Sequence, residues 1–152
     1  MKTSIITGAL VALLTGLAIG TQATISSRVG GLIGEFRTGL LSNLMGGLVA
    51  VIFMLFLLVY DGSGVWKVPS AIIAILTLSG TLGIFIITGI SFSLQRAGIA
   101  AGLATIILGQ LAFSFLIDSL GIGGVEQIPA SLARITGLAV TAFGVYLLLP
   151  KG

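Results

Sequence analysis

Long apolar runs dominate the chain and alternate with short polar segments. Each run approaches the ~20 residues that a helix needs to cross the ~30 Å hydrocarbon core of a bilayer. The pattern therefore predicts an all-α membrane protein whose residues 1–152 form one domain of five transmembrane helices. The expected spans are residues 4–26, 38–60, 71–94, 99–118 and 132–149. A secretory signal peptide is the alternative interpretation of the first run; we expect a retained span, because the rest of the chain is itself a multi-span membrane protein.

Polar and glycine-rich segments are expected to connect these spans. The predicted connections are residues 28–37, 61–64, 95–98 and 121–130. The third of them is so short that spans three and four should form a tight antiparallel hairpin. Pro69-Ser70 is expected to start the third helix, and Ser131 is expected to cap the fifth.

The fourth expected span carries three polar side chains four residues apart, Gln110, Ser114 and Asp118. A helix turns ~100° per residue, so each step of four advances the side chain by only ~40° and the three share one stripe. Gln110 is expected near the bilayer midplane and Asp118 near an interface. An amide that faced lipid at that depth would leave its donors and acceptors unpaired. We therefore expect the stripe to face protein or water, and we take it as the candidate functional face.

Two further amides, Gln22 and Asn43, are expected about five residues inside the opposite side of the membrane, on spans one and two. They either hydrogen-bond to each other or line a vestibule. In the second case the substrate-binding residues would be Gln110, Gln22, Asn43 and Ser114.

Asp118 has two possible roles. It could bind or release a coupling ion or proton during transport, because burial shifts the protonation of a carboxyl group. Alternatively it pairs with Arg134 near the interface or caps a loop. An acid so close to a helix end needs no functional explanation, which favours the structural role.

Composition excludes several classes of protein. The chain is 57% hydrophobic and only 7% charged, with a mean hydropathy of +1.26, so a water-soluble globule is excluded. Its basic residues are scattered singly, which argues against nucleic-acid binding. With no Cys, no His and four dispersed acids, neither a metal site, a cofactor nor an enzymatic activity is expected.

The basic residues are nearly balanced between the two sides of the predicted topology. The amino-terminal side holds Lys2, Lys67 and Arg134, and the other side holds Arg28, Arg37, Arg96 and Lys151. Orientation follows the Lys/Arg asymmetry, and a difference of one is a weak instruction. We therefore expect dual topology, with two copies forming an inverted, antiparallel dimer of ten helices. A fixed orientation set by a small margin is the alternative.

Two sequence elements carry a resemblance to a known family. Gly20-Thr21-Gln22-Ala23 and the later Gly109-Gln110, Ser114, Asp118, Gly121 set resemble the polar elements of the YdcZ-type small exporters of the drug/metabolite transporter superfamily. This resemblance implies a five-span half-transporter of the bacterial inner membrane that works as a pair. A relation to the small multidrug resistance exporters would imply a carboxylate in the first span. The chain has none there, which argues against proton/cation antiport by that route.

The leading hypothesis is a secondary transporter that exports a small organic metabolite or drug-like solute by alternating access. Its expected partners are the lipid bilayer, a small-molecule substrate, and a second copy of itself or a related five-span chain. The alternatives are a dual-topology channel for ions or small solutes and a non-transporting membrane subunit. The sequence specifies neither the substrate nor the direction of transport nor the coupling ion.

Overall fold

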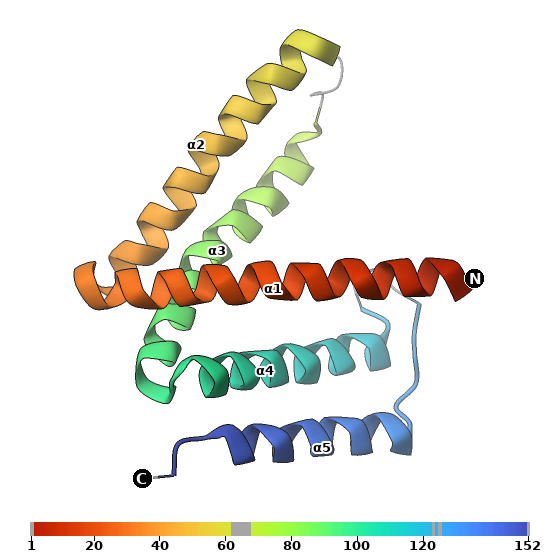
Figure 1. Ribbon diagram of the computed structural model, residues 1–152. Helices are drawn as coiled ribbons and strands as arrows, with labels where there is room; N and C mark the ends of the chain where they lie inside the picture. The colour runs from red at the N-terminus through yellow and green to blue at the C-terminus, as the bar shows by residue number, and fades with distance from the viewer. Residues whose placement is uncertain (1, 62–67, 123, 125, 152) are drawn as a thin grey trace. The chain divides into compact units, whose positions relative to one another are not determined.

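The computed structural model describes residues 2–61, 68–122, 124 and 126–151, and this part of the chain contains five helices (Figure 1). They are α1 (Lys2–Ile33), α2 (Glu35–Asp61), α3 (Ser70–Ala97), α4 (Ile99–Leu120) and α5 (Leu132–Leu148). The first four are long and apolar enough to cross a membrane. The fifth has 17 residues and is ~25 Å long at ~1.5 Å per residue. The all-helical membrane class is confirmed, whereas a fifth span and a ten-helix dimer stay predictions.

Single glycines separate two pairs of consecutive helices. Gly34 divides α1 from α2, and Gly98 divides α3 from α4, with φ of 92° and 81°. Glycine suits this left-handed region because it has no Cβ to clash with the backbone. The hydrogen-bond ladder continues through each glycine, since Gly34 donates to the Gly30 carbonyl at 2.9 Å and accepts from Thr38 at 3.1 Å. The chain thus turns within one residue.

The connection predicted over residues 28–37, a loop or an interfacial turn, is shorter than expected, because all of it except Gly34 is helical. Glycine inside a helix costs only ~1 kcal/mol relative to alanine, so the glycines of this segment do not prevent it from being helical. Gly30, within this segment, is buried. The connection expected at residues 95–98 shrinks to Gly98 alone, which confirms a very short connection, whereas the antiparallel hairpin of spans three and four stays a prediction.

Other helix ends follow the sequence signals. The third helix begins at Ser70, directly after Pro69. Ser131 caps α5, where its hydroxyl accepts from the Arg134 backbone N–H at 3.3 Å. Gly121 ends α4 with φ 65° and donates to the Ile117 carbonyl. The turn predicted at 61–64 falls largely on residues 62–67, which lie outside the described residues.

Contacts group the chain into two compact units, Met1–Phe92 and Ser93–Gly152. In the first unit the buried side chains are small or carry hydroxyls. Ser91 is fully buried and donates to the Ser26 carbonyl at 3.0 Å, which joins α3 to α1. Thr38 is 1% exposed and donates to the Gly34 carbonyl at 2.9 Å. Small residues and hydroxyl bonds are the usual means of helix association in membranes, where hydrophobic burial between helices contributes little.

A close helix approach in this unit is at Gly39, where α2 meets α3. A Cβ built there would lie 2.6 Å from the Ile84 carbonyl oxygen and would also meet Thr88. We expect Gly39→Ala to lower the free energy of unfolding by about 1–3 kcal/mol, because the backbones must move apart. Gly46→Ala on the same helix is the matched control, since nothing lies within 4 Å of its Cβ position. Thermal unfolding in detergent measures both variants, and equal losses of stability would contradict the close contact.

In the second unit the end of α3 packs on the start of α4, and α4 and α5 lie side by side in antiparallel directions (Figure 1). Leu94 and Ala101 are 2% and 3% exposed. A Cβ at Gly102 would lie 2.8 Å from Leu94 Cδ1, so this glycine allows the close local contact with Leu94. Most large apolar side chains elsewhere in the described helices are exposed, which suits a surface solvated by lipid chains.

Candidate functional site, the α4–α5 groove

A groove of about 360 Å³ lies between α4 and α5. It is lined by Leu111, Ser114, Phe115 and Asp118 of α4 and by Arg134, Gly137, Leu138 and Thr141 of α5. Both sets follow the spacing i, i+3, i+4, i+7, which marks one face of a helix. The volume falls within the roughly 300–1,000 Å³ of small-molecule sites. Apolar walls with a few polar groups are also typical of such sites.

An ion pair sits at the loop end of this groove. Arg134 Nη2 lies 2.6 Å from Asp118 Oδ2, with the two side chains 29% and 34% exposed. Arg134 Nη1 also donates to the Ile128 carbonyl at 2.8 Å, and its guanidinium carbon lies 5.0 Å from the centroid of the Phe115 ring. The predicted pairing of Asp118 with Arg134 is confirmed. A role of Asp118 in ion or proton coupling stays a prediction.

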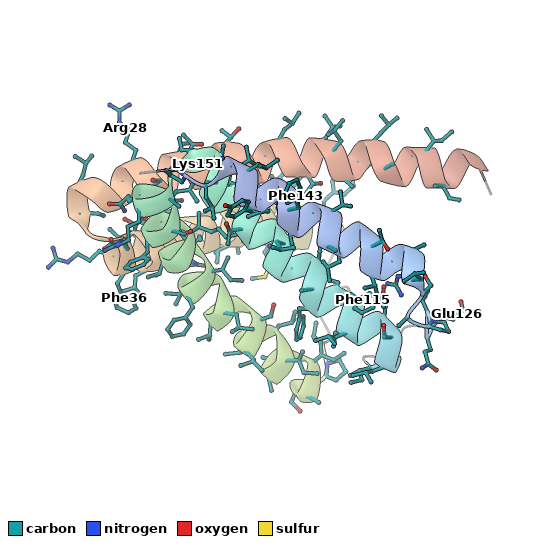
Figure 2. The ribbon with its side chains drawn as sticks, turned by 90° about the horizontal axis from the view of Figure 1, so that it is seen from below. Arg28, Phe36, Phe115, Glu126, Phe143 and Lys151 are labelled. Carbon is teal, nitrogen blue, oxygen red and sulfur yellow. The ribbon has the colours of Figure 1, made fainter. Side chains whose placement is uncertain are left out.

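The loop between α4 and α5 is tied to the end of α4. Ile128 donates its backbone N–H to the Asp118 carbonyl at 2.9 Å, and Gln127 Nε2 donates to the Ser119 carbonyl at 2.8 Å. Figure 2 shows Glu126 on this loop, beyond the half of α4 that carries Phe115. These two hydrogen bonds therefore hold the loop around Ile128 against the end of α4 that carries Asp118.

The groove takes only part of the predicted polar stripe. Ser114 and Asp118 line it, whereas Gln110 is exposed outside it. Viewed down the helix, the lining residues centre ~50° to one side of Ser114, and Gln110 lies ~40° to the other side, a difference of ~90°. Residues four apart are rotated by ~40° at each step around a helix. Gln110 therefore lies off the face of α4 that Asp118 shares with α5. Neither Gln110 nor Ser114 has a side-chain hydrogen bond within the described part of the chain.

Asn43 and Gln22 lie in the other unit and do not pair. Asn43 Nδ2 donates to the Gly39 carbonyl one turn earlier, at 2.9 Å, and its Oδ1 faces Gly83 of α3. Gln22 is exposed on α1. The alternative of a Gln22–Asn43 hydrogen bond is not realised between these two described side chains, because a polar side chain within a helix readily bonds back to its own backbone. Their role in a shared path with Gln110 stays a prediction.

Sequence reasoning missed the α5 wall of the groove. Arg134 was expected only as a partner for Asp118, and Leu138 and Thr141 were not singled out. Thr141 donates its hydroxyl hydrogen to the Gly137 carbonyl at 2.9 Å. Its oxygen can still accept a hydrogen bond from another group. The i, i+3, i+4, i+7 spacing from Arg134 is the signal that indicates this face. No three acidic side chains gather as a metal site would need in the residues that the structure describes.

Membrane-length apolar helices and a small-molecule-sized groove with an ion pair define a multi-pass membrane protein with a candidate solute site. The family model described as "Putative inner membrane exporter, YdcZ" matches residues 7–147. The chain therefore belongs to this family, and the resemblance noted from its polar elements is confirmed. No curated protein and no solved structure matches the chain. The family places the protein in the inner membrane and supports a role in export rather than in enzymatic catalysis.

Proposed function

We propose that the protein is a secondary transporter that exports a small organic metabolite or drug-like solute by alternating access. The observation that carries this proposal is the groove between α4 and α5 in a member of an exporter family. Its walls are mainly apolar, with two hydroxyls and one ion pair placed along them. Such a site can hold the body of a solute by burial and orient it by a few polar contacts.

We further propose that the working unit is an antiparallel dimer of ten helices. The support comes from Gln110, an exposed amide on a membrane-length helix with no hydrogen bond to any described residue. At that depth an amide requires a protein or water partner. In an inverted pair, residues near the midplane lie at similar depth in both copies, so the two Gln110 side chains can flank one cavity. The near balance of Lys and Arg across the predicted topology favours the same arrangement.

Reconstitution separates this carrier from the channel hypothesis. In proteoliposomes loaded with a panel of small organic acids, amines and neutral solutes, we expect saturable efflux of one class. In planar bilayers we expect no unitary currents, because a carrier changes conformation for each solute it moves on the μs–ms timescale of domain motions. Discrete single-channel openings that persist in the purified protein would refute alternating access. A requirement for a different, stoichiometric protein would instead identify the chain as a subunit.

A further inference from the structure

We propose that the α4–α5 groove binds a small organic anion, a carboxylate on an apolar body, and that its charged group binds Arg134 in place of Asp118. The proposal rests on the transport function above and names the chemical class of its solute. The juxtaposition that carries it is a guanidinium held by several elements beside a carboxylate that, among the described residues, is held by that guanidinium alone.

Arg134 keeps its position without Asp118. Its guanidinium bonds to the Ile128 carbonyl at 2.8 Å and stacks 5.0 Å from the Phe115 ring centroid, and these contacts come from the loop and from α4. The backbone below it is the first turn of α5, capped by Ser131. Cation–π and carbonyl contacts of this kind stabilise an arginine side chain in one orientation. The cation of the pair is thus the fixed member.

Asp118 is the movable member of the pair. Within the described part of the chain, the single partner of its carboxylate is Arg134 Nη2 at 2.6 Å. The side chain is 34% exposed, so water can solvate the carboxylate once it rotates away. In the empty groove, the Asp118 carboxylate therefore takes the position on Arg134 that the carboxylate of an anionic ligand would take.

Arg134 also has unused hydrogen-bonding capacity. A guanidinium carries five N–H donors, and one bond each to Asp118 and Ile128 leaves the others without a partner among the described residues. Arginine binds a carboxylate best through two parallel N–H···O bonds. The pair with Asp118 has one such bond, so a free carboxylate that approaches along the groove can form a better contact than the resident one.

The remaining walls suit the body of such an anion. Leu111, Phe115 and Leu138 supply apolar surface, and Ser114 supplies a hydroxyl without a hydrogen bond to any described residue. An organic cation would fit the site less well. To reach Asp118 it would have to displace Arg134, whose contacts with the Ile128 carbonyl and the Phe115 ring hold it in place.

The test measures binding of benzoate, phenylacetate and isovalerate to the purified full-length protein in detergent, by ligand-dependent thermal shift and by titration calorimetry. Benzylammonium and benzyl alcohol are the cationic and neutral comparisons. We expect at least one carboxylate to bind wild-type protein. Asp118→Asn should tighten that binding by about three- to tenfold because the internal competitor is gone, whereas Arg134→Gln should weaken it by about tenfold or more.

Two further variants and one comparison decide the interpretation. Glu126→Gln removes an exposed acid from the same loop and should leave binding unchanged. Arg134→Lys keeps the charge without the planar fork and should bind more weakly than wild type, which covers the case in which Arg134→Gln does not fold. Weaker carboxylate binding in both Asp118→Asn and the Arg134 variants would show a merely structural pair and overturn the proposal.

Two other outcomes would also overturn the anion assignment. One is binding of benzylammonium that Asp118→Asn abolishes, and the other is a wild-type protein that binds none of the three carboxylates. In both cases saturable efflux of another solute from proteoliposomes would leave the proposed transport function intact. Loss of that efflux for every solute class would refute the transport function itself.

Discussion

Variants forced into one orientation lose transport, and coexpression of two oppositely biased variants restores it. Arg28→Gln, Arg37→Gln and Lys151→Gln together leave one Lys/Arg on their side against three on the other. Lys2→Gln with Lys67→Gln leaves one against four in the opposite sense. Because orientation follows this asymmetry, each variant should insert one way only. An inverted pair then cannot form, and efflux should fall by about tenfold or more.

Orientation itself is measurable because the chain has no cysteine, so an introduced thiol is a unique label. Ile122 and Leu32 have exposed side chains and lie on opposite sides of the membrane in the predicted topology. Both are therefore suitable cysteine positions. In the wild-type background a membrane-impermeant reagent should label both positions in part, whereas each biased variant should label at one of them. Full transport by a variant of proven single orientation would show that an antiparallel dimer is not required.

Gln110→Ala should reduce efflux of a verified substrate by about tenfold, because polar groups at bilayer depth usually line a pathway or join helices. Phe113→Leu is the matched control. Phe113 is exposed on the same helix, ~150° from the centre of the groove-lining face. Its variant should transport and unfold like the wild type.

We expect Gln110→Ala to lose transport because the Gln110 amide has no hydrogen-bonding partner within the described residues of its own chain. In an antiparallel dimer its donors and acceptor would be satisfied by the second copy or by water in a shared cavity. Efflux of a verified substrate that is the same in Gln110→Ala and the wild type would remove this residue from the path. The α4–α5 groove and its ion pair would then stand as a site apart from it.

The groove also bears on how export could be driven. An inner membrane that is negative inside favours the outward movement of an anion. A carrier for organic anions therefore does not need a titratable carboxyl within its first span, and this chain has none there. The ion pair of Asp118 and Arg134 leaves these two side chains with no net charge, which lowers the cost of keeping the empty groove at membrane depth relative to a lone charge.

Sequence alone determined the class of the protein and the approximate position of every helix. Hydropathy runs, Pro69-Ser70, Gly98 and Ser131 are local signals, because a helix end depends on capping and backbone conformation within a few residues. The family resemblance was likewise visible in the polar elements around Gln22 and Gln110. The same signals were less exact at residues 28–37, where glycines and charges suggested a loop or an interfacial turn of ten residues and the structure has a turn of one residue.

Only the tertiary structure decided which face of each helix meets another. A spacing of four placed Gln110, Ser114 and Asp118 on one stripe, but the packing of α5 selected the face ~90° from Gln110 and added Arg134 to the site. Asn43 met α3 rather than Gln22 for the same reason. The rotation of a helix about its own axis is set by contacts with residues distant in sequence. Because lipid chains solvate all apolar faces of a helix alike, its local sequence does not indicate which face will meet another helix.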